Sequence, residues 1–140
     1  MFRWFKKFFA AHPGNPALQP KISTMASAFP DQIYLASDSV SSKKKGDSFL
    51  KQGKLAEAAT AYRQAISLDS CNAEAHLNLG YVLIEQQCLN EAKPYLQQAL
   101  AINPELFDAW FFLGNIAKIN GNTDEAIQNY QKTIKLKPDF

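Results

Sequence analysis

Residues with the chemistry for catalysis are scarce in this 140-residue sequence, and they form no catalytic pattern. The two histidines are His12 and His76, and the two cysteines, Cys71 and Cys88, have 16 residues between them. Zinc sites and disulfide frameworks use closely paired cysteines or cysteine–histidine clusters, and neither is present. No phosphate loop and no nucleophile-and-base motif can be recognised. We therefore predict that the protein is not an enzyme and binds no cofactor or metal.

The same residues have structural interpretations. Free cysteines are usually buried and persist in a reducing compartment, which favours buried thiols and a cytoplasmic location. His12 lies among prolines, and His76 is interpreted as a packing residue. The formal net charge is only +2, and the one run of like charge, Lys43 to Lys45, has no interleaved aromatic residues. We therefore expect no nucleic-acid partner.

One fixed period organises most of the chain. Three residue types recur at an interval of 34 residues: Gly46, Gly80 and Gly114; Ala58, Ala92 and Ala126; and Pro104 and Pro138. A fixed period in the range of about 20 to 50 residues is typical of a solenoid. Residues 73–86 carry two apolar stripes at helical spacing, and residues 89–102 carry one. Asn90 and Glu91 signal the start of the second helix, and Asn103-Pro104 its end. Each period is therefore predicted to be a helical hairpin.

The residues at fixed places in each period resemble the tetratricopeptide repeat family, whose unit carries a Trp, Leu-Gly, Tyr, Ala, Phe and Pro signature. The third unit has Trp110, Leu113, Gly114, Ala126, Tyr130 and Pro138, and the second has His76, Leu79, Gly80, Leu83, Ala92, Leu96, Ala99 and Pro104. The first is degenerate, with Ser42 and Lys45 in place of Trp and Leu. The resemblance implies an all-α, right-handed α-solenoid with repeats at residues 39–72, 73–106 and 107–140.

The resemblance also implies a binding surface, because the first helix of each repeat lines the concave face in this family. The candidate partner-binding positions are Lys43, Leu77, Asn78, Tyr81, Ile84, Phe111, Phe112 and Asn115. Five of them form an apolar and aromatic strip, which favours an apolar peptide or a partner helix. The alternative for each apolar residue is packing between helices.

One subtype of the family grips the C-terminal carboxylate of a peptide with five side chains. Lys43 and Asn78 match two of these places. Asp47, Asp108 and Phe112 stand in the other three, where the subtype has Asn and two cations. Two carboxylates would repel the peptide, so we exclude the chaperone-tail function.

Residues 1–10 form an amphipathic aromatic and basic segment. Wound as a helix, Phe2, Trp4, Phe5, Phe8 and Phe9 lie opposite Arg3, Lys6 and Lys7, a pattern typical of an interfacial membrane helix. This favours peripheral membrane contact. The alternative is a flexible or partner-docked N-terminus. The segment fits neither a membrane span nor a secretory signal.

Residues 11–38 are rich in proline, serine and alanine and are predicted to be a linker. Its apolar cluster, Phe29 with Ile33, Tyr34 and Leu35, is expected to dock as a short turn or extended piece, or to stay undocked. Ser37, Asp38 or Ser39 would then cap the first helix.

At the other end, Phe140 takes the last position of the third repeat, so no further helix covers the final hairpin. Ile127, Tyr130 and Ile134 are then expected to be uncovered, which leaves a self-association surface, a partner site, or packing against the next element of a longer chain. The preferred function is an interaction scaffold. The alternative is the substrate-recruiting repeat region of a larger transferase, such as a glycosyl- or methyltransferase.

Overall fold

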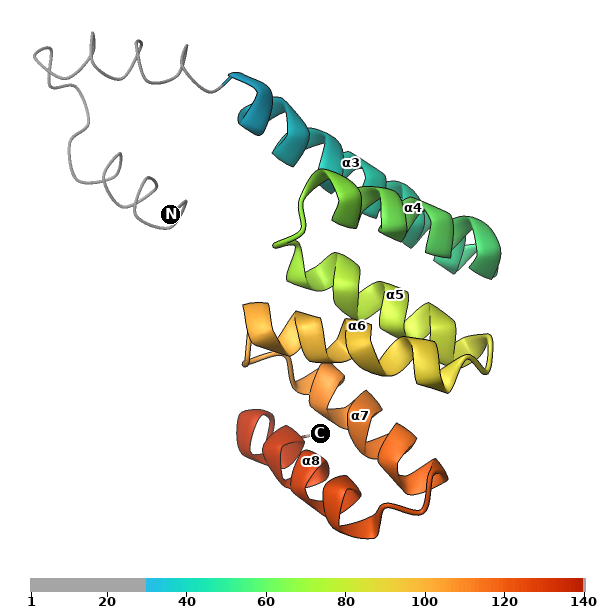
Figure 1. Ribbon diagram of the computed structural model, residues 1–140, viewed down its shortest axis with the longest axis vertical. Helices are drawn as coiled ribbons and strands as arrows, with labels where there is room; N and C mark the ends of the chain where they lie inside the picture. The colour runs from blue at the N-terminus through green and yellow to red at the C-terminus, as the bar shows by residue number, and fades with distance from the viewer. Residues whose placement is uncertain (1–29, 140) are drawn as a thin grey trace, which may run out of the picture. The chain divides into compact units, whose positions relative to one another are not determined.

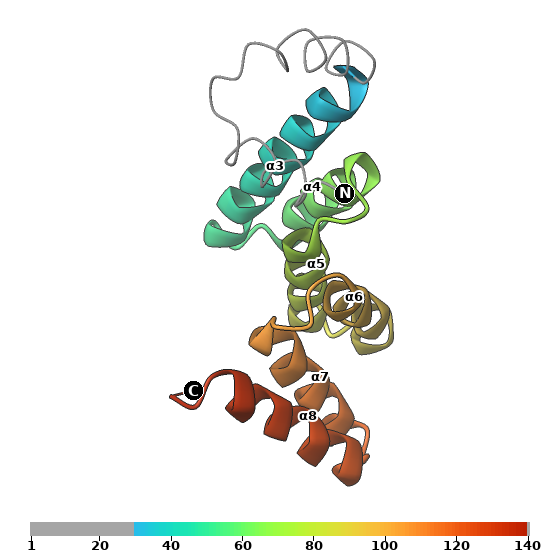
Figure 2. The same ribbon diagram turned by 90° about the vertical axis from the view of Figure 1, so that its left-hand side faces the viewer.

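Paired helices make up the described part of the chain. The computed structural model describes residues 30–139, in which every regular element is an α-helix. The hairpins are α3 (Pro30–Lys51) with α4 (Leu55–Leu68), α5 (Ala73–Glu85) with α6 (Leu89–Ile102), and α7 (Phe107–Ile119) with α8 (Thr123–Leu136). They follow one another in a stack, with the second between the first and the third (Figures 1 and 2). This confirms the predicted all-α solenoid of three helix-turn-helix repeats.

The turn inside each hairpin has the same backbone geometry. Gly53, Gln87 and Gly121 occupy the same place in successive repeats and have positive φ angles of 72°, 62° and 76°. The residue after each of them donates its amide to a carbonyl five residues earlier, as Cys88 N does to Leu83 O at 2.8 Å. This bond and a left-handed residue after the last helical turn define a Schellman motif. Two of the three turns use glycine, the residue that this conformation favours.

Gln87 is the one side chain held in this left-handed conformation in the described residues. Replacing Gln87 by glycine is expected to raise the free energy of unfolding by about 0.5–1 kcal/mol, because the steric cost of the Cβ is removed. Chemical denaturation of both proteins measures the change. The matched variant is Gly121→Gln at the equivalent turn, which should lose a similar amount. Equal stability of all three proteins would contradict this account of the turns.

Small residues bring the two helices of each hairpin together. A Cβ built on Gly80 would lie 2.6 Å from Cδ2 of Leu96, and one on Gly114 would lie 2.5 Å from Cε1 of Tyr130. Gly46 meets the ring of Tyr62 in the same way, at 2.6 Å. The side chain from the second helix thus occupies the space above each of these glycines, which explains why glycine recurs at this place in every repeat.

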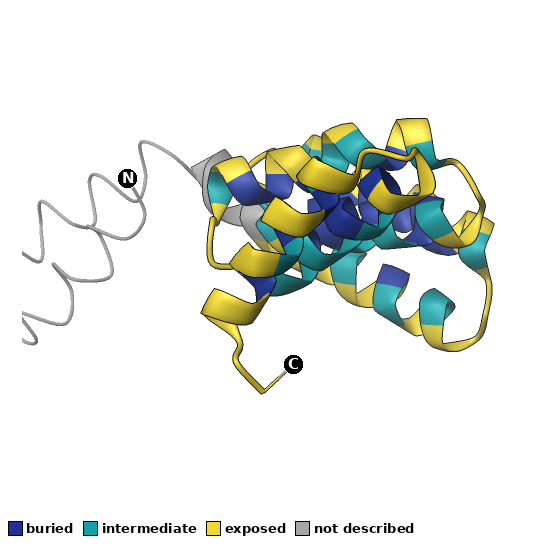
Figure 3. Ribbon diagram, turned by 90° about the horizontal axis from the view of Figure 1, so that it is seen from below, coloured by how far each residue is buried: buried dark blue, intermediate teal, exposed yellow. Residues whose placement is uncertain are grey.

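The core runs through the interior of the stack (Figure 3). Its largest fully buried apolar side chains are Tyr62, Leu79, Leu83, Leu96 and Val82, all at most 1% exposed. The second hairpin supplies four of these five, because it has a hairpin on either side. Removing apolar surface from water along this line is the main force that holds the repeats together.

The first helix begins earlier than the sequence predicts. α3 starts at Pro30, so the end of the predicted linker is helical and the expected turn or extended piece at residues 33–35 is wrong. Proline suits the first turn of a helix, and no other proline follows before Pro94. Ser39 is therefore inside the helix and does not cap it.

The predicted membrane-contact residues, Phe2, Trp4, Phe5, Phe8 and Phe9, lie outside the described residues, as does His12. Membrane contact therefore stays a prediction. Within residues 30–139, no helix combines the length and the apolar character needed to cross a bilayer.

Candidate partner-binding groove

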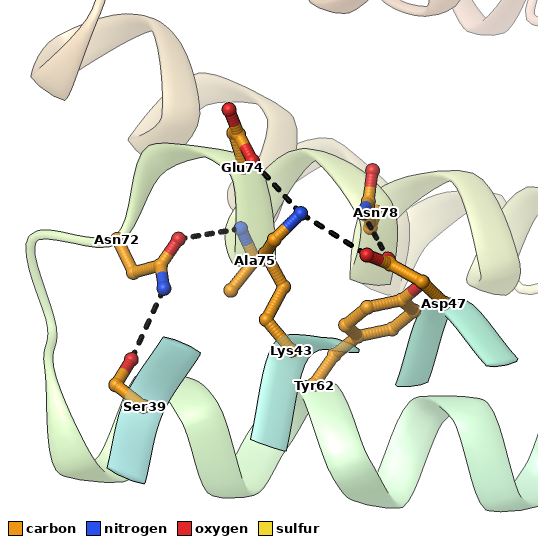
Figure 4. Close-up of polar contacts among 8 residues, drawn as sticks. All are labelled: Ser39, Lys43, Asp47, Tyr62, Asn72, Glu74, Ala75 and Asn78. Atoms are coloured by element: carbon orange, nitrogen blue, oxygen red, sulfur yellow. Dashed lines mark hydrogen bonds and ion pairs between the residues drawn. The ribbon is translucent and has the colours of Figure 1, made fainter. Parts of the chain in front are cut away.

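Asp47 is the centre of a polar cluster between the first two hairpins (Figure 4). Its Oδ1 atom accepts hydrogen bonds from Tyr62 Oη at 2.8 Å and from Asn78 Nδ2 at 3.0 Å. Its Oδ2 atom accepts from Lys43 Nζ at 3.1 Å, and the same ammonium pairs with Glu74 Oε2 at 2.8 Å. The cluster thus joins α3, α4 and α5.

The charges in this cluster are largely satisfied by one another. Burial opposes the charge of Lys43, but hydrogen bonds to Glu74 and Asp47 outweigh burial and raise the pKa of its ammonium. Burial, followed by the hydrogen bond to Asp47, also raises the pKa of the Tyr62 hydroxyl. Both groups therefore stay protonated across the physiological range and act as donors to the carboxylate.

A second polar contact holds the start of α5 against the first hairpin (Figure 4). Asn72 caps α5, since its Oδ1 atom accepts from the backbone amide of Ala75 at 3.0 Å. Its Nδ2 atom donates to Ser39 Oγ at 3.0 Å, and Ser39 donates in turn to the carbonyl of Ala65 at 2.9 Å. Ser39 is fully buried, so these bonds satisfy a hydroxyl that would otherwise be costly to bury.

Aromatic side chains from α5 and α7 meet next to the polar cluster. The rings of Tyr81 and Phe112 stack with centroids 5.4 Å apart, and Phe111 lies 5.9 Å from Phe112. Phe111 is also 6.1 Å from Tyr130 of α8, whose hydroxyl donates to Asn115 Oδ1 at 2.8 Å. We call Tyr81, Phe111 and Phe112 the aromatic strip. All three are half-buried and keep part of their surface in water.

The other predicted groove residues differ in how far they are buried. Leu77 is only 9% exposed and belongs to the core, so packing is its role. Ile84, like Phe112 of the aromatic strip, packs against that core and is partly buried. Asn78 and Asn115 remain accessible in part, but each is already hydrogen-bonded, to Asp47 and Tyr130 respectively.

Asp108 lies in the first turn of α7, the helix that carries Phe111 and Phe112. It is half-buried, and burial raises the pKa of its carboxyl, against the opposing charge of Lys137. Burial thus disfavours the charged form of this carboxyl. The repulsion of a peptide carboxylate by Asp108 stays a prediction.

Sequence reasoning missed the role of Asp47 as a shared acceptor and the participation of Tyr62 and Glu74. A signal was available: tyrosine occupies the same place in the first and third units, and its hydroxyl finds Asp47 in one and Asn115 in the other. The middle unit has Leu96 at that place, which needs no polar partner.

His76 is a packing residue, as predicted. It is 6% exposed, and its Nε2 atom lies 3.1 Å from the carbonyl oxygen of Ser70. Trp110, at the same place in the next repeat, makes the same contact, with Nε1 donating to the carbonyl of Pro104 at 3.0 Å. The imidazole therefore reproduces the indole hydrogen bond of the repeat.

The prediction of buried thiols is wrong, because Cys71 and Cys88 are both free and exposed. Both follow the ends of helices in short turns, where a side chain has little to pack against. Within residues 30–139, no group of three or more His, Cys, Asp or Glu side chains could hold a metal ion. An open hollow of about 300 Å³ lies between α3 and α4 around Phe49 and Ala61, and no predicted groove residue lines it.

Solved structures share this arrangement of helices. The first TPR of Spaghetti (RPAP3) bound to the HSP90 peptide SRMEEVD is 23% identical, with a TM-score of 0.72 over 75% of this chain and 83% of that one. MamA is 29% identical, with a TM-score of 0.70 over 84% of this chain and 66% of that one.

Two characterised relatives match only in part of their length. Cellulose synthase operon protein C of Komagataeibacter xylinus is 28% identical over 105 residues, which are 75% of this chain and 8% of that protein. Tetratricopeptide repeat-containing protein trd-1 of Caenorhabditis elegans is 34% identical over 79 residues, 56% of this chain and 10% of that protein. The chain thus spans about a tenth of the length of these relatives.

Two of the three family models match in register with the hairpins. A TPR repeat model matches residues 46–87, and two tetratricopeptide repeat models match residues 73–106 and 107–140. The second and third boundaries coincide with those predicted from the sequence period. Three models, the helical hairpins and the signature residues agree from residue 46 to residue 140, so the chain belongs to the tetratricopeptide repeat family.

Proposed function

We propose that this chain is a protein-interaction module that binds an apolar peptide or a partner helix across α5 and α7. The observation that carries the proposal is the aromatic strip, in which the rings of Tyr81 and Phe111 each contact that of Phe112 and all three residues stay partly exposed. Covering such rings with an apolar side chain is favourable by about 25 cal/mol per Å² of apolar surface removed from water. Family membership supports the general role in protein–protein interaction.

The polar cluster beside the strip supports an uncharged or apolar ligand over an anionic one. Lys43 already pairs with the carboxylates of Asp47 and Glu74, and Asn78 already donates to Asp47. An incoming carboxylate would have to displace these bonds and would lie next to two negative charges. Repulsion of this kind excludes unwanted ligands.

A direct prediction concerns the peptide SRMEEVD, which binds the Spaghetti (RPAP3) domain. We expect no measurable affinity of this chain for a fluorescein-labelled SRMEEVD peptide in a fluorescence polarisation titration. The matched variant combines Asp47→Asn, Asp108→Lys and Phe112→Arg, which supplies the residue types of the carboxylate-gripping subtype, and it should bind more tightly than the wild type. Micromolar binding by the wild type would contradict the proposed exclusion of anions.

The proposed ligand class is tested by selection from a random dodecapeptide phage library on the immobilised wild-type chain. Selected peptides should be rich in aromatic and large aliphatic residues. Resynthesised peptides are then titrated against the double variant Tyr81→Ser and Phe111→Ser, which should lose at least about tenfold in affinity, equivalent to about 1.4 kcal/mol. The control is Leu136→Ser, an exposed apolar residue of α8 outside the strip. Equal losses in both variants, or none in the first, would reject the proposed surface.

A further inference from the structure

One side of α8 carries two exposed isoleucines. Ile127 and Ile134 are 48% and 58% exposed, although each is a large apolar side chain. Their separation is close to two helical turns, so they point in nearly the same direction. Tyr130, which the sequence analysis grouped with them, instead turns toward Gly114 and Asn115. The exposed face of α8 is therefore defined by Ile127 and Ile134.

In the two preceding hairpins the apolar residues at the equivalent places are covered, and the remaining equivalent place holds Lys93 of α6, which pairs with Glu125 of α8 at 2.8 Å. The counterparts of Ile134 are Ile66 of α4, which packs against the core, and Leu100 of α6, which is 7% exposed. The counterpart of Ile127 in α4 is Ala59, only 2% exposed. The second helix of each earlier hairpin packs against the first helix of the next, α4 on α5 and α6 on α7. The exposed face of α8 thus has the position and character of a helix-docking surface.

The other end of the stack cannot supply the matching helix. Val82 of α5 and Ile116 of α7 each follow by two residues the glycine that faces the other helix of the hairpin, so they point away from that helix, about 200° around the axis. Both are nevertheless at most 2% exposed. The preceding hairpin therefore covers them. The equivalent residue of α3 is Ser48, which is exposed together with Lys45 and Gln52. Stacking this polar face of α3 on the isoleucines of a second copy would desolvate a lysine without a partner.

The charges along α8 are arranged so that two copies of α8 complement each other when antiparallel. Its first turn carries Asp124 and its last turn carries Lys135. At about 100° per residue, both lie on the same flank of the isoleucine face. When Ile127 of one copy is set against Ile134 of the other, Asp124 and Lys135 of opposite copies come within about 3 Å along the axis. Antiparallel helices also oppose their dipoles favourably.

We propose that two copies of this chain associate through α8 in an antiparallel, two-fold pair centred on Ile127 and Ile134. A two-fold interface uses the same surface on both copies. The exposed face of α8 suits such an interface, because in the antiparallel pair Ile127 meets Ile134 and Asp124 meets Lys135 of the other copy. The partner-binding face on α5 and α7 carries none of these residues, so the pair would present two binding surfaces.

Light scattering after size exclusion, over a wide range of concentration, tests the pairing on the full chain. The wild type should move toward twice the 15.6 kDa chain mass as concentration rises. The double variant Ile127→Lys and Ile134→Lys should stay monomeric with an unchanged circular dichroism spectrum. Leu136→Lys, which is 40% exposed on another side of α8, is the control and should still dimerise.

The charge arrangement is tested by a reversal and its rescue. Lys135→Glu places like charges opposite each other and should weaken the dimer about tenfold, whereas Asp124→Lys with Lys135→Glu should restore it. A wild type that is monomeric at every concentration would overturn the proposal and leave the face to a different partner. A dimer that survives the two isoleucine substitutions, or that the charge swap fails to restore, would overturn it too.

Discussion

Replacing Leu79 by alanine is expected to lower the free energy of unfolding by about 3–4 kcal/mol. Leu79 is fully buried in the second hairpin and is part of the continuous core. The substitution removes three buried carbon atoms and leaves a cavity that neighbouring helices, packed on both sides, can only partly fill. Urea denaturation followed by circular dichroism measures the loss.

The control for Leu79 is the equivalent residue of the first repeat. Lys45 takes that place, is exposed, and has its Nζ atom 6.0 Å from the centre of the Phe49 ring. Lys45→Ala should change stability by less than about 0.5 kcal/mol, as is usual for surface substitutions. Equal losses of stability from Leu79→Ala and Lys45→Ala would contradict the assignment of Leu79 to the core and of Lys45 to the exposed surface of α3.

Replacing Asp47 by alanine is expected to cost about 2–3 kcal/mol, because it removes the acceptor of three hydrogen bonds, one of them from an ammonium. The hydroxyl of the buried Tyr62 loses its partner, and Lys43 keeps only Glu74. Thermal and urea denaturation of the variant measure the loss.

The matched variant is Asn115→Ala, the equivalent place in the third repeat. Asn115 accepts one hydrogen bond, from Tyr130, so its loss should cost about 1 kcal/mol. A double-mutant cycle of Asp47→Ala with Tyr62→Phe should then show coupling, since the hydroxyl has no acceptor once Asp47 is gone. Additive effects in that cycle would mean that the Tyr62–Asp47 bond contributes little.

Much of the fold could be predicted because the close crossing of two helices recurs at a fixed period. Gly80 and Gly114 mark the helix crossings, and the side chains of Leu96 and Tyr130 fill the space above them. His76 could be assigned to packing because its place in the repeat is that of Trp110 in the next one. These features depend on local spacing, which is fully visible in a sequence.

The candidate site was predictable only in part, because its chemistry depends on contacts between repeats. The periodicity placed Leu77 and Tyr81 on the same helix face, but only the packing of the folded chain shows that Leu77 is buried while Tyr81 keeps exposed surface. The hydrogen bonds to Asp47 come from three helices, so spacing alone does not reveal them. The start of α3 was missed because the region before it looks like a linker until Pro30 is recognised as a first-turn residue.

The sequence of the first repeat now has a physical explanation. Lys45 replaces the leucine found at Leu79 and Leu113, and Ser48 replaces the apolar residue found at Val82 and Ile116. Both replacements lie on exposed surface of α3. The departures of the first repeat from the family signature therefore follow from the exposure of this face of α3, while the helical hairpin itself is kept.

The proposed binding face is tested most directly by mapping where a selected apolar peptide binds. The measurement is the change in backbone amide chemical shifts of the ¹⁵N-labelled chain as the peptide is added. The account predicts that the largest changes lie on α5 and α7, around Tyr81, Phe111 and Phe112, and that they vanish in the variant with Tyr81→Ser and Phe111→Ser. Changes centred on α4, on α6 or on the exposed face of α8 would contradict it.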